Sequence, residues 1–311
     1  DDDALDAAIQ DTDVFARVSP QHKHRIVESL RRLGHVVAMT GDGINDAPAL
    51  EVSEIGVAMG IAGTDVTRET ADMVLTDDNF ASIVNAVEEG RVVFQNIRKV
   101  VKFLLATNIG EDITILASLV LFTAGELIIT PVQILWVNLV TDGLLDITIA
   151  MEPKEGDVMR QPPRKPMERI INREIAQNAL YVSLFMAAGT LGVFAWANQV
   201  GNAHYARTMA FTTLAMFQVF NSLNCRSRRV SVFRLGLFGN LYLIGAIVLS
   251  VSLQVLANRV PFLQAALDTE PLSLADWGLI VLVSSSIFVA DEVRKLVQSR
   301  RARVSEHRAS A

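Results

Sequence analysis

The sequence predicts an α/β portion followed by an all-α membrane domain of six transmembrane helices. Half of the 311 residues are hydrophobic, and most of these lie in long apolar blocks beyond about residue 100. The residues before these blocks carry charges at the density of a soluble domain and alternate short β-like runs with polar turns. The apolar blocks are each roughly 20 residues long, which is enough for a helix to cross a bilayer.

The first part of the chain begins with an acidic stretch, DDDALDAAIQDTD, which predicts a solvated helix and has no feature of a signal peptide. Further on, the apolar run GHVVAM (residues 34–39) predicts a buried strand, and it leads into the polar turn TGDGINDAPAL (residues 40–50). Acidic residues directly after a strand are how α/β proteins present metal and phosphate ligands. This turn is therefore a candidate site.

The membrane domain is predicted from six apolar runs. They are Val100–Phe122, Pro131–Met151, Ile175–Ala197, Tyr205–Leu223, Leu237–Ala257 and Ala275–Val297. Three of the flanking segments are rich in Lys and Arg, namely 154–174, 225–234 and the tail after residue 293, whereas the alternate loops contain none or one. By the positive-inside rule, the rich segments and both termini are cytoplasmic.

Net charge and cysteine content exclude some classes of protein. The formal net charge is −6 and no long basic run occurs, so the sequence offers no electrostatic basis for a nucleic-acid partner. The single cysteine, Cys225, excludes a disulfide or a multi-thiolate metal site within this chain. We expect Cys225 to be a packing residue.

Polar residues inside the first two spans predict a cation site. Asn108 and Glu111 are three residues apart on one face of the first span. In the second span, Asn138, Thr141 and Asp142 follow the same spacing, next to Gly143, where the helix can loosen. Intramembrane carboxylates are costly and mark ion paths, and ligands made only of oxygen suit hard cations such as Ca²⁺, Mg²⁺, Mn²⁺ or Na⁺.

Alternatives remain for several of these polar groups. Asn108 and Asn138 have a purely structural interpretation as hydrogen bonds between helices. Asp112 and Asp146 fit an ion path and local pairing equally well. In the fourth span, hydrogen bonding between helices explains the uncharged polar residues at least as well; these are Gln218, Asn221 and Ser222.

Five segments in order resemble the C-terminal portion of a P-type cation-transporting ATPase of the calcium-pump-like subgroup. They are FARVSPQHK, MTGDGINDAPAL, DNFASIVNAVEEGR, PVQILWVNLVTDG and RQPPRKP. The resemblance implies that the α/β portion is part of a haloacid-dehalogenase-like phosphorylation domain, with ATP and Mg²⁺ as cofactors. In such a domain the turn after a parallel strand lies at the carboxyl edge of the sheet, where ligands bind.

The resemblance also implies roles for individual residues. Asp42 is expected to bind Mg²⁺, and Asn45 and Asp46 to orient the phosphoryl group and the waters of the metal. Lys23 is expected to neutralise charge on the transferring phosphoryl group. Thr40 and Gly41 complete the turn, and the matches for the transported cation are Asn108, Glu111, Asn138, Thr141 and Asp142.

Two motifs of the family, DKTGT with its phosphorylated aspartate and TGE, do not occur in this sequence, nor does a nucleotide-binding domain. We therefore expect a C-terminal fragment whose partner is the missing N-terminal part of the same pump, and which alone forms no phosphoenzyme. The predicted divisions are the phosphorylation domain with a stalk helix (1–98), the transmembrane domain (99–298) and a cytoplasmic tail (299–311).

The predicted function is ATP-driven transport of a hard cation across the membrane, through a continuous helix from the catalytic sheet to Glu111. Ca²⁺ is the first choice, because the intramembrane ligands resemble those of the calcium pumps. The resemblance implies one ion per cycle, because Ala215 stands where two-site calcium pumps carry a glutamate. The alternatives are Mn²⁺, Mg²⁺, Na⁺ or H⁺, or a non-catalytic membrane partner. The expected location is the plasma membrane of a bacterium.

Overall fold

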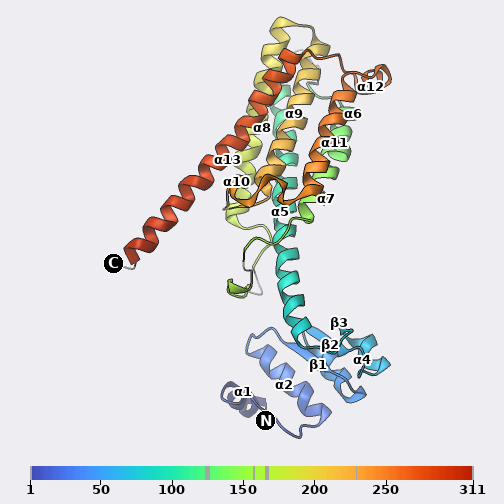
Figure 1. Cartoon of the computed structure of the whole chain (residues 1–311), viewed down its shortest axis with the longest axis vertical. Helices are drawn as coiled ribbons and strands as arrows, with labels where there is room; N and C mark the ends of the chain where they lie inside the picture. The colour runs from blue at the N-terminus through green and yellow to red at the C-terminus, as the bar shows by residue number, and fades with distance from the viewer. Residues whose placement is uncertain (1, 123–126, 157, 165–167, 229, 310–311) are drawn as a thin grey trace. The chain divides into compact units, whose positions relative to one another are not determined.

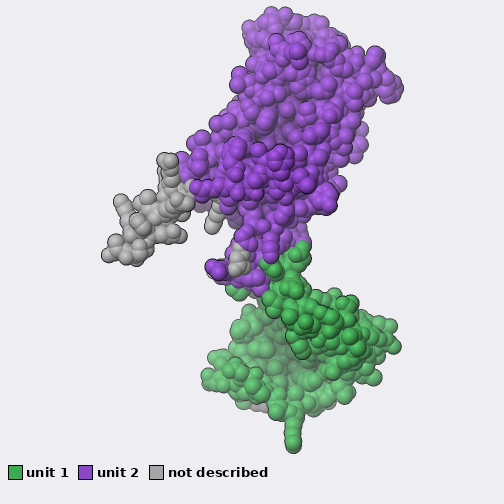
Figure 2. Space-filling model, viewed as in Figure 1, with its two compact units in different colours: residues 1–90, 163–167 green, residues 91–162, 168–311 purple. Residues whose placement is uncertain are grey.

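The computed structural model describes residues 2–122, 127–156, 158–164, 168–228 and 230–309, with no side chains from residue 299 onward. The chain forms two compact units, residues 1–90 with 163–167 and residues 91–162 with 168–311 (Figure 2). The boundary between the two units falls at residue 90, inside a long helix. The predicted boundary at residue 98 separates functional parts of the chain, and it stays a prediction. Of the five segments on which the family resemblance rests, RQPPRKP (residues 160–166) lies partly outside the described residues, since its last two are not among them.

The first unit contains a three-stranded parallel sheet in the order β1-β2-β3. Its elements are α1 (Asp2–Gln10), α2 (Pro20–Arg32), β1 (Ala38–Gly41), η1 (Ile44–Asp46), α3 (Ala47–Val52), β2 (Ile55–Met59), α4 (Asp65–Thr70) and β3 (Met73–Leu75). The central strand β2 is buried from Gly56 to Met59, as expected for a parallel strand with neighbours on both sides. The acidic N-terminal stretch is helical as predicted, because α1 covers most of it.

The strand predicted over residues 34–39 was wrong in its start and its burial. β1 begins at Ala38, and Val36 is exposed. Val37 lies before the strand, where its N–H donates to the Glu54 carboxylate over 3.0 Å and its carbonyl accepts from the Glu54 N–H over 3.1 Å. β1 is an edge strand of the described sheet, so its apolar residues are not covered on every side.

The second unit is helical. Its elements are most of α5 (Ala81–Leu121), then α6 (Pro131–Trp136), η2 (Val137–Asp142), α7 (Gly143–Ala150), η3 (Val158–Arg160), α8 (Arg173–Val200), α9 (Ala203–Cys225), α10 (Val232–Leu235), η4 (Leu237–Gly239), α11 (Leu241–Ala257), α12 (Pro261–Leu267) and α13 (Leu274–Ala309). The helix α5 runs without interruption for 41 residues. In Figure 1, α8, α9 and α13 lie side by side in this unit, in agreement with their contacts.

Several helices of this unit are long and apolar enough to cross a membrane. Within the described residues there are four: Ala81–Leu121, Pro131–Ala150, Arg173–Val200 and Leu274–Gln298. The pair α11 and α12 adds a fifth if it forms one span, with a bend of 88° between its halves. The structure therefore fits a helical membrane domain, but length and composition do not confirm six spans.

The helix α9, which contains the predicted fourth span, explains part of this difference. It contacts α7, α8, α11, α13 and η2, so most of its side chains are buried in the unit. A helix that faces other helices on most sides can carry Thr, Gln and Asn as interhelical hydrogen-bonding groups, which lowers its apolar character. Packing there is close: a Cβ at Gly189 of α8 would lie 2.4 Å from the Phe217 ring of α9.

Candidate functional site

The predicted catalytic turn lies directly beyond β1. Thr40 and Gly41 pair with Val57 and Ala58 of β2 in a parallel ladder, and Asp42 is the next residue. Its carboxylate therefore lies at the carboxyl edge of the sheet, where α/β proteins bind ligands. Asp42 is exposed, and no hydrogen bond or ion pair to its side chain is found among the described residues.

Lys23 and Asp46 form an ion pair beside this turn. The Lys23 Nζ lies 2.5 Å from Asp46 Oδ1, and Asp46 Oδ2 accepts long hydrogen bonds from the N–H groups of Asp42 and Gly43, at 3.3 and 3.4 Å. Burial raises the pKa of the Asp46 carboxyl, but the hydrogen bonds from Lys23 and the backbone outweigh this effect, so the pKa is below its ordinary value. Asp46 thus stays ionised and holds the turn together.

Local sequence explains how Lys23 and Asp46 meet. Ser19 caps α2 by accepting from the His22 N–H, and Pro20 occupies the first helical turn, which places Lys23 near the helix start. Gly41 leaves the space that Asp46 fills, since a Cβ at Gly41 would lie 2.5 Å from the Asp46 Cβ. Asn45, by contrast, is exposed on η1.

A second loop supports the turn, and the sequence analysis missed it. The Thr64 N–H donates to the Asp42 carbonyl over 3.0 Å, at the end of the loop 60–64 that follows β2. The Asp78 carboxylate holds this loop by accepting from the N–H groups of Ile61 and Ala62, at 3.0 and 2.7 Å, and these bonds lower its pKa. The sequence feature that could have indicated this loop is the set of glycines in the apolar segment GVAMGIAG (residues 56–63).

The donor set at the turn suits Mg²⁺ in part. The free Asp42 carboxylate supplies the oxygen ligand that Mg²⁺ prefers, and Mg²⁺ usually binds through one or two carboxylates together with phosphate oxygens and waters. Both Asp46 oxygens are engaged by Lys23 and backbone N–H groups, so Asp42 is the available ligand in this arrangement. In the described part of the chain, no group of three or more His, Cys, Asp or Glu residues is close enough to hold a metal ion.

The second candidate site lies in the helical unit, where two predicted carboxylates are buried. Glu111 of α5 is 4% exposed and Asp142 of η2 is 3% exposed. Asp142 ends a stretch of π-helix, Val137–Asp142, in which the Gly143 N–H bonds to the Asn138 carbonyl five residues back. Single π-helical turns are rare and often occur at functional sites, because they shift backbone groups out of the regular pattern. Thr141 is also buried.

Unpaired polar atoms belong to Asp142 itself and to Gln218, which contacts Glu111. Gln218 of α9 donates from Nε2 to Glu111 Oε1 over 2.7 Å. Both Asp142 oxygens and the Gln218 Oε1 are buried with no hydrogen-bond partner among the described residues. Buried polar atoms normally have partners, so this group of oxygens fits a bound cation or ordered water.

Two predicted ligands, Asn138 and Asn108, are exposed. Asn138 is exposed on η2 and is close enough to Glu111 to interact with its carboxylate. Asn108 is also exposed, and its amide donates to the Leu104 carbonyl over 2.8 Å. Of the further acids, Asp112 is exposed and Asp146 is partly buried, with one carboxylate oxygen unpaired.

Comparison with known proteins identifies the family of the chain. Residues 126–297 match the family described as cation transporting ATPase, C-terminus, over more than half of the sequence. The chain therefore belongs to the P-type cation-transporting ATPases, as the resemblance of its segments predicted. The family and the apolar helices make it an integral membrane protein.

The curated relatives include calcium-transporting ATPases. One of Bacillus subtilis (strain 168) is 44% identical over 283 residues, which cover 90% of this chain and 32% of the relative. Calcium-transporting ATPase 1 of Saccharomyces cerevisiae is 42% identical over 299 residues, covering 95% and 31%. Calcium-transporting ATPase 1 of Bacillus cereus is 41% identical over 313 residues, covering 96% and 35%. The chain thus spans about a third of the length of the relatives it matches.

Proposed function

We propose that this chain is part of an ATP-driven pump for a hard cation, with Ca²⁺ as the transported ion. In this proposal the chain contains the ion-binding site and a part of the site of phosphoryl transfer. The observation that carries this proposal is the pair of buried carboxylates, Glu111 and Asp142, on two different helices, with both Asp142 oxygens unpaired among the described residues. Hard cations take six to eight oxygen ligands, and carboxylates supply the charge that holds them. The names of the relatives favour Ca²⁺.

The remaining ligands follow from their places around these carboxylates. Thr141 is buried and adjoins Asp142 in the sequence, and the exposed Asn138 interacts with Glu111. Asn108, one helical turn before Glu111 on α5, is the further ligand in this proposal. Gln218 positions the Glu111 carboxylate through its hydrogen bond. Its other amide atom, Oε1, is unpaired and is a further candidate ligand.

In the first unit, we propose that the turn after β1 works as the acceptor side of a haloacid-dehalogenase-like phosphorylation domain. Asp42 would hold Mg²⁺, which would supply positive charge to the phosphoryl group that ATP provides. Lys23 offsets phosphoryl charge while paired with Asp46, and Asn45 reaches the phosphoryl group from the exposed face of η1. Thr40 and Gly41 set the backbone of the turn.

The aspartate that is phosphorylated and the nucleotide-binding residues belong, in this proposal, to the portion of the pump outside the matched third of the relatives. The complete pump forms an aspartyl phosphate when the cation is bound and hydrolyses it to reset the cycle. The 311 residues alone are predicted to hydrolyse no ATP. This expectation is separate from the ion site, which requires only the helical unit.

The helix α5 supports a coupling role. It is continuous from Ala81 to Leu121 and carries Glu111, so a displacement at its start can reach the ion ligands without a break in hydrogen bonding. We propose that phosphorylation and hydrolysis change access to the cation site through this helix.

For the membrane topology, we propose six spans. These are the four long apolar helices, the helix α9, which packs among the others, and the helix α11. The Lys- and Arg-rich segments then lie on the cytoplasmic side with both termini, in the plasma membrane of a bacterium. The functional divisions remain 1–98, 99–298 and 299–311.

The test of this function uses the complete pump in membrane vesicles. Phosphorylation from ATP is measured with Ca²⁺, Mn²⁺, Mg²⁺ and Na⁺ supplied in turn over a constant level of Mg-ATP. Stimulation by micromolar Ca²⁺ supports the proposal. Stimulation by another cation alone identifies that cation as the substrate, and no stimulation by any of them contradicts a pump for these four cations.

A further inference from the structure

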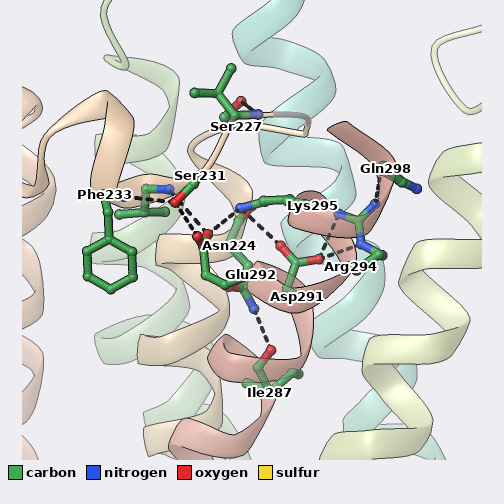
Figure 3. A network of polar contacts seen from close by, with 12 residues as sticks. Asn224, Ser227, Ser231, Phe233, Ile287, Asp291, Glu292, Arg294, Lys295 and Gln298 are labelled. Carbon is green, nitrogen blue, oxygen red and sulfur yellow. Dashed lines mark hydrogen bonds and ion pairs between the residues drawn. The ribbon is translucent and has the colours of Figure 1, made fainter. Parts of the chain in front are cut away.

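Among the networks of buried polar groups in the helical unit, two differ in their place relative to the candidate cation site. The first is charged and lies on α13, where Figure 3 shows Lys295 between Asp291 and Glu292, at 3.0 and 3.1 Å. None of these residues adjoins a predicted cation ligand in the sequence. The second network is neutral and ends on Trp136, which directly precedes the π-helical stretch Val137–Asp142. The second network is therefore the one that can act on the cation ligands.

The neutral network runs across three helices. The Trp136 Nε1 of α6 donates to Gln254 Oε1 of α11 over 3.3 Å, and Gln254 Nε2 donates to the Thr212 hydroxyl of α9 over 3.2 Å. Asn258, four residues after Gln254, donates to the same hydroxyl over 3.0 Å. Gln254 is 2% exposed, and Thr212 and Asn258 are also buried. Gln254 is therefore the link between α6 and the buried helix α9.

The π-helical stretch depends on neighbouring helices for the directions of its side chains. Its backbone bonds reach five residues back instead of four, as in the bond from the Gly143 N–H to the Asn138 carbonyl. The geometry of a regular α-helix therefore does not set where these side chains point. Two of the predicted cation ligands in the stretch, Thr141 and Asp142, are buried, so contacts on either side of the stretch decide what they face.

Such contacts are found on both sides. After the stretch, the Asn240 amide at the start of α11 donates to the Thr148 carbonyl of α7 over 2.9 Å. Before it, the Gln133 amide of α6 donates to a carbonyl of α12 over 2.8 Å, and Trp136 donates to Gln254. Of these three contacts, the one between Trp136 and Gln254 lies closest in the sequence to the cation ligands.

We propose that Gln254 is a positioning residue for the cation site: it holds Trp136 and thereby sets the rotation of the helix that carries Asp142. The inference rests on the proposed function, because Gln254 is not itself a ligand in it. Loss of the bond to Trp136 leaves every ligand in the chain but changes the direction in which those of the π-helical stretch point. Cation affinity then falls, whereas the number of sites stays the same.

Equilibrium binding of radioactive Ca²⁺ to the complete pump in membranes tests the inference, because it measures the affinity and the number of sites separately. Gln254→Met keeps the length of the side chain and removes the acceptor of the Trp136 N–H. Trp136→Phe removes the N–H itself and keeps an aromatic ring. We expect each variant to lower the Ca²⁺ affinity about threefold or more, with an unchanged number of sites per folded pump.

A double-mutant cycle and a matched control separate positioning from a general loss of stability. If Gln254 acts through Trp136, the double variant loses no more affinity than either single variant, since both remove the same bond. Asn224→Leu is the control. Asn224 is also a buried amide that joins two helices, and Figure 3 shows it with Ile287 of α13, whose carbonyl accepts from Asn224 Nδ2 over 3.3 Å. Asn224→Leu should lower stability but leave the Ca²⁺ affinity unchanged.

Each outcome decides the inference. Unchanged Ca²⁺ affinity in Gln254→Met and Trp136→Phe, or losses that add up in the double variant, overturns it. An equal fall in affinity for Asn224→Leu shows a general effect of looser helix packing and also overturns it. No Ca²⁺ binding by the parent pump contradicts the proposed function itself, and this inference with it. If Gln254→Met does not fold, Trp136→Phe and Asn224→Leu give the decision through affinity and number of sites.

Discussion

Gln218 of α9 and Glu111 of α5 are joined by a buried hydrogen bond, with Gln218 Nε2 donating to Glu111 Oε1 over 2.7 Å. The two residues are 107 positions apart in the sequence. The bond fixes one oxygen of Glu111, and Asn138 of η2 is close enough to interact with the same carboxylate. The orientation of the carboxylate therefore depends on a helix that supplies no charge of its own to the site.

Replacing Gln218 with Ala should weaken cation binding only mildly, because the charge of Glu111 remains and only one neutral donor is lost. Loss of a hydrogen bond to a charged group corresponds to about 1.5–3 kcal/mol, part of which the cation itself can restore. Equilibrium binding of radioactive Ca²⁺ to membranes measures this. A complete loss of binding would make Gln218 a principal ligand instead of a positioning residue.

Asp42→Asn in the complete pump should abolish phosphoenzyme formation. The variant keeps the shape of the turn after β1 but removes the one carboxylate there that is free of protein partners. Labelling by γ-labelled ATP measures the phosphoenzyme, and Asp11→Asn, an exposed acid in the same unit, is the control. Labelling at the level of the parent pump would remove Asp42 from the Mg²⁺ site.

The ion pair between Lys23 and Asp46 predicts a pH dependence of stability. The pKa of Asp46 is below its ordinary value of 3.8 in the folded chain, because the hydrogen bonds from Lys23 and the backbone outweigh burial. Asp46 therefore stabilises the fold above pH 3.8, and this contribution is lost as the pH falls below 3.8 towards the folded pKa. Lys23→Met should raise the pKa of Asp46 and shift acid unfolding to higher pH.

Circular dichroism during acid titration follows this shift, and Lys23→Arg is the matched variant, because it keeps the positive charge. Acid unfolding of Lys23→Met at the same pH as the parent chain would show that the pair does not stabilise the turn. The comparison with Lys23→Arg separates loss of charge from loss of the side chain.

Gly41→Ala should destabilise the first unit by about 1–3 kcal/mol, because overpacking forces neighbouring groups apart. The added Cβ would lie 2.5 Å from the Asp46 Cβ and displace the carboxylate from Lys23. Gly90→Ala is the control, since a Cβ there has no neighbour within 4 Å and should favour the helix by about 0.5–1 kcal/mol. Thermal unfolding measures both, and an unchanged melting temperature for Gly41→Ala would show that the turn has room to relax.

The positions of Asp42 and Glu111 could be predicted from the sequence because each depends on a local pattern. A run of apolar residues followed by acids places Asp42 at the end of a strand, and helical spacing in an apolar block places Glu111 inside a bundle. The start of β1 could not be predicted as well, because Val36 is apolar but exposed. Whether an apolar residue beside an edge strand is buried depends on which other segments cover it. The partner of Glu111 could not be derived, since helical periodicity gives the face of a helix and not the neighbour that meets it.

Other parts of the structure depend on contacts distant in sequence. The loop that holds Asp42 is fixed by Asp78, which follows β3 and has no sequence feature of a ligand. Glu152 and Arg226 form a buried ion pair at 2.9 Å, although Glu152 directly follows the predicted second span and Arg226 lies in a basic segment predicted to be cytoplasmic. The α9 span was expected from its apolar residues, but its central place explains why those residues are interrupted by polar ones.

The central claim is that Glu111 and Asp142 bind the transported cation, and equilibrium binding of radioactive Ca²⁺ to Glu111→Gln and Asp142→Asn tests it most directly. Each substitution keeps the shape of the side chain and removes one negative charge. The account predicts that Ca²⁺ affinity falls about tenfold or more in both variants, which corresponds to 1.4 kcal/mol or more. Asp112→Asn, an exposed acid next to Glu111, should bind as the parent does. Unchanged Ca²⁺ binding in both buried-carboxylate variants would contradict the account.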